Sequence, residues 1–364
     1  MLEKPNKVEI VIAKFKLNKV KIFKALLPIL GILIGAFVGS LVILAKGVNP
    51  ITAYAALLDG AFGNIDNFSA SLIKTIPLGI TGLAVIVSYK AGIFNIGGEG
   101  QIQLGAVAAT LIGTQFVGLN PFLYVSLCIL SAALAGGLFA AIPGIAKAYK
   151  GYNEIVICML MNYIAILFVS LMVQGPMKMK GQYFPQSAPL DLGAKLPNII
   201  PNTQLHAGII LLLAGCILVY FVIFKTTFGF KLRAVGINLR ASQYGGINAK
   251  RVMALAMIIS GAMAGIAGGV EIMGVHGRLI ENFSPGYGYD AIAVALLANL
   301  NPLWLLLSAF FFGALRNGAI NMQIMTGVPV SFVYIIQALA VLFVISATGI
   351  PRFLKKVKRA KKNV

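Results

Sequence analysis

The sequence predicts an all-α protein that crosses a membrane about ten times. Of its 364 residues, 59% are hydrophobic and only 11% are charged, whereas a soluble domain is about 25% charged. The mean hydropathy is +0.90. Apolar runs of about 20 residues recur along the chain, and a helix of that length crosses the hydrocarbon core of a bilayer. An outer-membrane barrel would instead show short strands of alternating hydrophobicity.

The apolar runs place the spans in order along the chain. The predicted spans are 23–45, 71–89, 91–113, 121–146, 153–174, 206–224, 251–273, 288–300, 302–316 and 329–348. Asn301-Pro302 interrupts the stretch 288–316, where two short crossings, one kinked span and a re-entrant pair all stay open. The segment 46–70 is predicted as an external loop with room for an interfacial helix.

The basic residues gather at both ends and in one internal connection. The formal net charge is +20, and Lys and Arg concentrate in the tails 1–22 and 351–364 and in the loop 225–250. Because Lys and Arg accumulate in cytoplasmic loops, both termini and this loop are predicted to face the cytoplasm. The 175–205 loop then lies outside. Basic residues placed beside spans favour contact with membrane lipid over binding of nucleic acid.

The cysteine and histidine residues give no sign of a metal or redox centre. Cys128, Cys158 and Cys216 each lie in a predicted span without CxxC or His-partnered spacing, so packing roles are expected. His206 and His276 lie near loop edges and far apart in sequence. No paired aspartates, Ser/His pair or metal-ligand motif indicates an enzyme. The sequence therefore predicts neither a metal site nor catalysis.

One predicted span carries a run of polar residues. The spacing of Asn95, Glu99 and Gln103 places them on one helix face, which would line a polar pathway. A carboxylate near the bilayer centre costs at least ~2.5 kcal/mol. Alternatively, the helix unwinds at Gly97-Gly98 and a half-helix N-terminus meets the substrate. A third interpretation, in which Glu99 only pins neighbouring helices through hydrogen bonds, is equally open.

A second polar group begins the span 153–174. Asn153 suits a helix N-cap, and Glu154 complements the helix dipole, although a gating role is the alternative. Asn162 lies two turns deeper, where it faces either a pathway or a neighbouring helix.

The internal basic loop contains the signals of a short helix. Asn238 is a good N-cap, Leu239 to Tyr244 form about two turns, and Gly245-Gly246 supplies a stop. A short helix held between two spans suits docking into a groove of a partner protein. The alternative is a simple connector whose basic residues face lipid.

Three motifs carry a resemblance to a known family. They are Gly-Ile-Phe-Asn-Ile-Gly-Gly-Glu-Gly-Gln at 92–101, Asn-Glu-Ile-Val at 153–156 with Met-Leu-Met-Asn-Tyr at 159–163, and the pattern at 229–252. In this order they resemble the permease subunits of bacterial ABC importers for branched-chain amino acids, simple sugars and nucleosides. The first motif resembles the nucleoside branch, and the second resembles the larger of its two permeases. The resemblance covers residues 23–348, so the Lys-rich ends lie outside it.

The resemblance implies an ABC-importer permease over residues 23–350, which forms the path of a nucleoside through the bacterial cytoplasmic membrane. It also implies three partners: an ABC ATPase, a second homologous permease and an extracytoplasmic nucleoside-binding lipoprotein. Because the chain has no Gly-x-x-x-x-Gly-Lys-[Ser/Thr] phosphate loop, ATP and Mg are expected on the ATPase and no cofactor on this chain. ATP-driven movement of the helix 238–244 would switch the side to which the pathway opens.

Two sets of residues are predicted to carry this function. The substrate pathway is assigned to Asn95, Glu99, Gln101, Gln103 and Asn162. Coupling to the ATPase is assigned to Arg233, Gly236, Asn238, Leu239, Arg240, Ala241, Tyr244, Gly245 and Gly246. Simple sugars or branched-chain amino acids as cargo stay open. So does an ion-coupled secondary transporter that uses Glu99 as its titrating group.

Overall fold

The computed structural model describes most of the chain, namely residues 30–31, 33–116 and 118–343. Both predicted basic tails lie outside the described residues. So do residues 23–29 of the first predicted span and residues 344–348 of the last. The chain divides into two compact units. One holds the described residues up to Tyr54 and from Met322 onward, and the other holds Ala55–Asn321. Each unit is described by itself below.

The smaller unit holds two apolar helices, Leu33–Ala45 and Ser331–Phe343. Gly35 lies against the backbone of Ile336, where an added Cβ would come within 3.1 Å of the Ile336 carbonyl oxygen. A residue without a side chain lets two helices approach this closely. The described parts of the first and last predicted spans are therefore helical and packed against each other.

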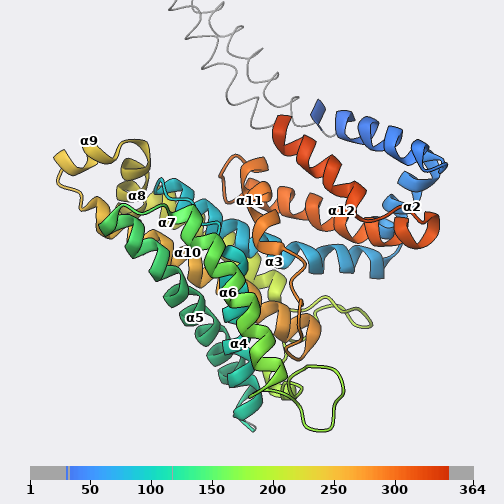
Figure 1. Cartoon of the computed structure of the whole chain (residues 1–364), viewed down its shortest axis with the longest axis horizontal. Helices are drawn as coiled ribbons and strands as arrows, with labels where there is room; N and C mark the ends of the chain where they lie inside the picture. The colour runs from blue at the N-terminus through green and yellow to red at the C-terminus, as the bar shows by residue number, and fades with distance from the viewer. Residues whose placement is uncertain (1–29, 32, 117, 344–364) are drawn as a thin grey trace, which may run out of the picture. The chain divides into compact units, whose positions relative to one another are not determined.

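The remaining elements follow one another along the chain (Figure 1), and the longer connections are those after α6 and between η2 and α11. They are α2 (Pro50–Phe62), α3 (Ile65–Lys90), α4 (Gly98–Gln115), α5 (Pro121–Lys150), α6 (Glu154–Gln174), the 3-10 turn η1 (Leu192–Ala194), α7 (Gly208–Lys225), α8 (Thr227–Ile237), α9 (Leu239–Tyr244), α10 (Ala249–Glu271), the π-helical turn η2 (Ile272–His276), α11 (Tyr287–Leu297) and α12 (Trp304–Thr326). Within the described residues, β pairing is limited to isolated bridges. The all-α prediction is confirmed.

Six helices of the described part are long and apolar enough to cross a membrane, or seven if Leu33–Ala45 and α2 form one bent span. The six are α3, α5, α6, α7, α12, and α10 continued by η2. Three further helices, α4, α11 and Ser331–Phe343, coincide with predicted spans but are shorter or more polar. A multi-pass membrane protein is therefore confirmed, and the number of ten crossings stays a prediction.

The predicted loop 46–70 is largely helical. α2 is the helix expected there, and α3 begins at Ile65 rather than at residue 71. The earlier start has a local cause: the Asn64 side chain caps α3 by accepting a hydrogen bond from the Asn67 amide at 2.7 Å.

The stretch 288–316 is two separate helices. Residues 298–303 separate α11 from α12, and Asn299 and Leu300 have φ angles of 53° and 54°. This left-handed backbone cannot continue a right-handed helix. α12 then runs well past its predicted end, to Thr326. A separate membrane crossing by each helix stays a prediction.

The core of the larger unit is α10, which packs along α4 and α5 through glycines. A Cβ on Gly265 would overlap the Ala132 carbonyl oxygen of α5, and one on Gly105 of α4 would overlap the Gly265 carbonyl oxygen. A Cβ on Gly136 would likewise overlap the Gly261 carbonyl oxygen. The three backbones touch because these positions have no side chain.

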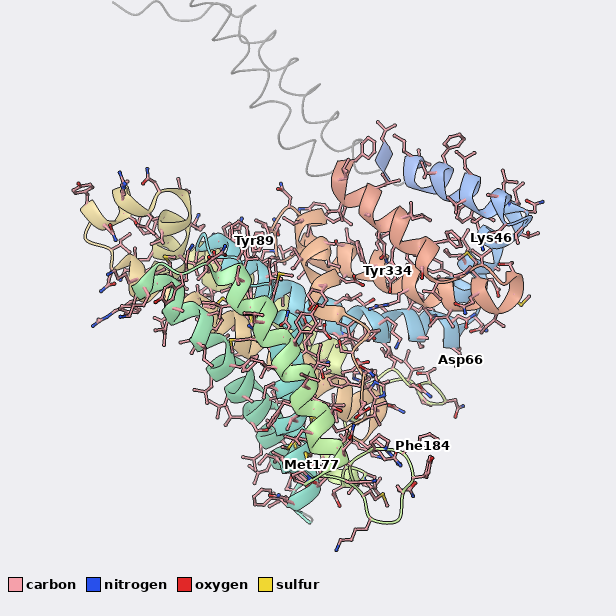
Figure 2. All side chains as sticks on the ribbon, viewed as in Figure 1. Lys46, Asp66, Tyr89, Met177, Phe184 and Tyr334 are labelled. Carbon is pink, nitrogen blue, oxygen red and sulfur yellow. The ribbon has the colours of Figure 1, made fainter. Side chains whose placement is uncertain are left out.

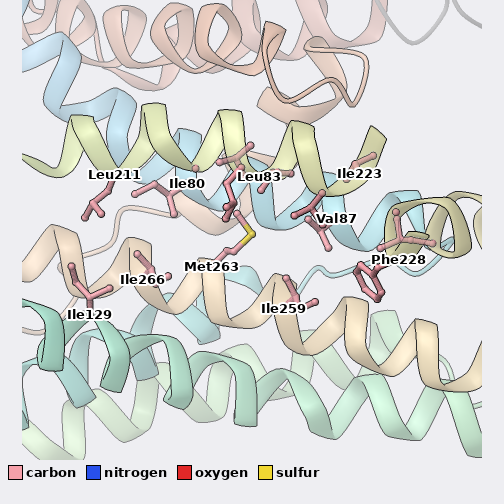
Figure 3. Close-up of a pocket in the computed structure, with 16 residues that line it drawn as sticks. Ile80, Leu83, Val87, Ile129, Leu211, Ile223, Phe228, Ile259, Met263 and Ile266 are labelled. Atoms are coloured by element: carbon pink, nitrogen blue, oxygen red, sulfur yellow. The ribbon is translucent and has the colours of Figure 1, made fainter. Parts of the chain in front are cut away.

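An apolar cavity of about 220 Å³ lies among α3, α7 and α10. Figure 3 shows Leu83 of α3 and Met263 of α10 lying in the space between these helices. Gly215 of α7 also lines it. The lining of this cavity is almost wholly hydrocarbon, so it would bind only apolar groups. A path for a polar solute must therefore lie elsewhere.

Candidate functional site

The connection between α3 and α4 differs from the predicted continuous helix. Residues 91–97 are not helical, and α4 begins at Gly98. Asn95 therefore does not share a helix face with Glu99 and Gln103, and that alignment was wrong. The Asn95 side chain accepts a hydrogen bond from the Gly97 amide at 3.0 Å, a local bond that competes with helix formation. The alternative, a helix that starts at Gly97-Gly98, is what the structure has.

Asn95 joins three helices through a buried network. Its Nδ2 donates to Gln101 Oε1 and to Ser260 Oγ, each at 2.8 Å. Gln101 Nε2 returns a bond to Asn95 Oδ1 at 2.9 Å. The Ser260 hydroxyl donates to the Ala84 carbonyl at 2.7 Å. The network thus ties α4 to α10 and α3.

Glu99 binds the N-terminus of α11. Its Oε2 accepts a hydrogen bond from the Gly288 amide at 2.8 Å, and the side chain is only 2% exposed. A Cβ on Gly288 would overlap the Glu99 backbone, so the two helix starts touch. An anion at a helix N-terminus is favourable because unpaired amides and the helix dipole meet it there.

Asn162 completes the cluster from α6. Its Oδ1 accepts a hydrogen bond from the Gly100 amide at 2.8 Å. Its Nδ2 donates to the Ile96 carbonyl at 3.0 Å and to Tyr289 Oη at 3.2 Å. The start of α4 is thereby held by α6 and α11 together.

The five predicted pathway residues therefore meet around the first turns of α4, all of them buried. The structure gives Asn95, Glu99, Gln101 and Asn162 hydrogen-bond partners inside the chain. Their role in the pathway stays a prediction. Gln103 Nε2 donates to Glu99 Oε1 at 3.4 Å, and Gln103 also lines a cavity.

Removing the Glu99 carboxylate is expected to destabilise the protein. Glu99→Leu leaves the buried Gly288 amide without its acceptor and should cost about 2–3 kcal/mol. Glu99→Gln keeps one acceptor oxygen and should cost about 1 kcal/mol. Thermal unfolding in detergent measures both. The control is Asp66→Asn, an exposed acid in the first turn of α3. An unfolding temperature of Glu99→Leu equal to that of the unmodified protein would contradict this role.

A charged group near the same helix ends was missed in the sequence. Arg316 Nη2 donates to the Pro285 carbonyl at 2.6 Å and lies 3.5 Å from Asp290 Oδ2. Its guanidinium lies over the Tyr287 ring, 4.8 Å from the centroid. The Tyr287 hydroxyl donates to Glu271 Oε1 at 3.4 Å. Arg316 thus offsets acids whose burial would otherwise be costly. The signal in the sequence was a single arginine, Arg316, within the apolar run that forms α12.

Glu271 is a buried acid at the end of α10. It lies 3.7 Å from His276 Nε2 and beside Tyr287. Glu271 therefore belongs to the buried group around Arg316.

The start of α6 has the predicted cap. Asn153 Oδ1 accepts a hydrogen bond from the Ile155 amide at 3.0 Å, which confirms the N-cap. Glu154 forms an ion pair with Lys147 at 2.8 Å and accepts a long bond from the Phe94 amide at 3.5 Å. A gating role for Glu154 stays a prediction.

The predicted short helix of the basic loop is confirmed as α9. Asn238 Oδ1 accepts a hydrogen bond from the Ala241 amide at 3.0 Å, Gly245 is the C-cap, and Gly246 has a φ of +79°. Tyr244 is 95% exposed. Figure 1 shows α9 at one end of the bundle, opposite the loop that follows α6. An exposed helix in this place is available to a partner.

The helix α8 that precedes α9 was not predicted. Thr226 caps it by accepting a hydrogen bond from the Gly229 amide at 3.1 Å, a signal that is visible in the sequence. Arg233 of α8 lies over the Phe224 ring, 5.4 Å from its centroid, and donates to the Gly229 carbonyl at 3.3 Å. Arg233 therefore packs against the bundle rather than extending away from it.

The end of α8 contacts the connection before α4. A Cβ on Gly236 would overlap the Lys90 carbonyl oxygen and lie 3.2 Å from the Gly92 amide nitrogen. The Tyr89 and Phe94 rings pack edge to face across that connection, 4.7 Å apart. Figure 2 shows Tyr89 at this end of the larger unit, and Met177 and Phe184 at the other. A backbone contact thus links the α8–α9 pair to the segment that carries Asn95.

Comparison with known proteins identifies the family of this chain. The family described as "Branched-chain amino acid transport system / permease component" matches residues 67–345. The guanosine ABC transporter permease protein NupP of Bacillus subtilis is 37% identical over 338 residues, which are 92% of this chain and 97% of that protein.

Two further relatives cover similar lengths. The glucose ABC transporter permease protein TsgB13 of Haloferax volcanii is 34% identical, over 90% of this chain and 88% of that protein. The nucleoside ABC transporter permease protein NupB of Lactococcus lactis is 30% identical, over 93% of this chain and 95% of that protein. No solved structure matches this chain. The chain belongs to the family of permease components of branched-chain amino acid transport systems.

Proposed function

We propose that this chain is the transmembrane subunit of an ATP-driven importer and forms the path of nucleosides through the bacterial cytoplasmic membrane. The supporting observation for coupling is α9, an exposed, capped helix whose neighbour α8 contacts the α3–α4 connection. A partner that moves α9 therefore acts on the start of α4, where the predicted pathway residues meet.

The partner set follows from the same proposal. A separate ABC ATPase docks on the residues around α9, since the chain has no phosphate loop of its own. A second homologous permease completes the pathway, and an extracytoplasmic nucleoside-binding lipoprotein delivers the cargo. Both termini and α9 then face the cytoplasm, as the basic clusters predict.

Nucleosides are the favoured cargo for two reasons. The relatives NupP and NupB, named for guanosine and nucleosides, are similar over at least 92% of this chain. The motif at 92–101 also resembles the nucleoside branch. A simple sugar is the second candidate, because the relative TsgB13 is named for glucose and is 34% identical. Uptake of labelled guanosine and glucose by cells that express the complete importer distinguishes the two.

A negative charge introduced on α9 is expected to prevent the ATPase from docking there. Leu239 is 40% exposed at the start of α9, and Leu239→Asp places a carboxylate on the helix that the ATPase is proposed to contact. Co-purification of the ATPase should fall at least about tenfold, with the permease still present in the membrane. Leu192→Asp is the matched control, because Leu192 is 82% exposed in the loop at the opposite end. ATPase recovery that is equal for both variants would contradict the docking assignment.

A further inference from the structure

A small cavity of about 130 Å³ lies between α4, α6 and the segment that joins η2 to α11. Its polar residues come from all three elements: Gln103, Ser170, Glu281 and Asn282. The rest of its wall is apolar, formed by Ile166, Leu167 and Val169 of α6. Sites for small molecules combine apolar walls with a few convergent polar groups in this way.

Gln103 supplies an unused acceptor. Its side chain is 3% exposed, and its Nε2 donates a long hydrogen bond to Glu99 Oε1 at 3.4 Å, which favours this orientation of the amide. Within the described residues, Gln103 Oε1 accepts no hydrogen bond. A buried acceptor without a partner is costly, and a hydrogen-bond donor on a ligand would recover that cost.

Glu281 supplies a second acceptor. Ser170 Oγ and Gln174 Nε2 each donate to Glu281 Oε1 at 2.6 Å. These hydrogen bonds lower the pKa of the Glu281 carboxyl, so it is ionised at neutral pH. The pair of donors holds one carboxylate oxygen in place, and within the described part of the chain the other oxygen accepts no hydrogen bond.

The ligand must therefore carry hydrogen-bond donors beside an apolar face. The two acceptors lie on different elements, so each can accept a hydrogen bond from a separate hydroxyl group, while Ile166 and Leu167 offer an apolar wall to the carbon face of a sugar ring. The cavity is smaller than the ~300–1,000 Å³ typical of sites for whole drug-sized ligands. It has room for a sugar-sized group, with the rest of the molecule outside.

We propose that Gln103 and Glu281 form a subsite for the adjacent hydroxyl groups of a sugar ring, the ribose of the transported nucleoside. This subsite rests on the proposed function and assigns the part of the cargo that the permease itself recognises. Ser170 and Gln174 act as positioning residues, because their hydrogen bonds hold the Glu281 carboxylate in place.

The test uses the complete importer in proteoliposomes, with guanosine and 2′,3′-dideoxyguanosine as probes. Gln103→Leu removes the acceptor and should lower guanosine uptake at least about tenfold, with less than about twofold change for the dideoxy compound. Glu281→Leu should act in the same direction, and Glu281→Gln, which keeps an oxygen acceptor, should act less. Gln115→Leu, at the exposed far end of α4, is the matched control.

The outcomes separate the subsite from the function. Selective loss of guanosine uptake in both leucine variants supports the subsite. Equal losses for the two probes, or unchanged discrimination between them, would overturn it while leaving nucleoside import intact. If the unmodified importer moves neither compound with ATP, the proposed function fails and the subsite fails with it.

Discussion

Guanosine uptake by the Gly236→Val variant is expected to fall at least about tenfold while the ATPase stays bound. Gly236 is the point at which α8 rests on the backbone of Lys90 and Gly92, and a valine side chain would overlap the Lys90 carbonyl oxygen. The end of α8 must then move away from the α3–α4 connection. A movement of α9 would no longer reach Asn95 and the start of α4.

Two measurements establish this result. ATPase recovery with the purified permease shows that docking is intact, and ATP-dependent uptake shows that coupling is lost. Gly215→Val is the matched control, because the nearest atom to an added Cβ there is the flexible Leu83 side chain at 3.1 Å. Uptake by Gly236→Val at the rate of the unmodified importer would contradict transmission through this contact.

Leucine in place of Gly265 is expected to prevent stable folding. Gly265 of α10 faces the Ala132 carbonyl oxygen and the backbone of Gly136 on α5, so neither neighbour is a side chain that can rotate away. Separating these helices also breaks the contact between Gly265 and Gly105 of α4. We expect a loss of at least about 3 kcal/mol in the free energy of unfolding.

The amount of protein extracted from the membrane and its unfolding temperature in detergent check this expectation. Gly215→Leu makes the same change on α7, where the new side chain enters the apolar cavity of about 220 Å³. That variant should fold. If Gly265→Leu has the same unfolding temperature as the control, the glycine contacts do not hold the core together.

The sequence alone was enough to predict those helices whose start and stop signals lie close together in the chain. The cap Asn238, the two turns to Tyr244 and the stop at Gly245-Gly246 lie within nine residues of one another, and α9 forms as predicted. The cap of α6 at Asn153 is local in the same sense. Such caps depend on backbone groups two or three residues away.

The sequence alone could not predict the contacts between residues that lie far apart in the chain. Asn95 is not helical because its side-chain amide is hydrogen-bonded both to the nearby Gly97 backbone and to Ser260, 165 positions later. The ion pair of Arg316 with Asp290 likewise depends on how α11 meets α12. Hydrophobic periodicity carries no information about these pairings. The sequence therefore predicted the members of the polar cluster but not the hydrogen bonds among them.

This permease is expected to move no cargo uphill unless a separate ATPase acts on it through α9. The direct measurement places the purified chain in liposomes, alone and with its partner subunits, and follows labelled guanosine. We predict no accumulation by the chain alone, and accumulation by the full complex that requires ATP. Accumulation by the chain alone, driven by a proton or sodium gradient, would contradict the account.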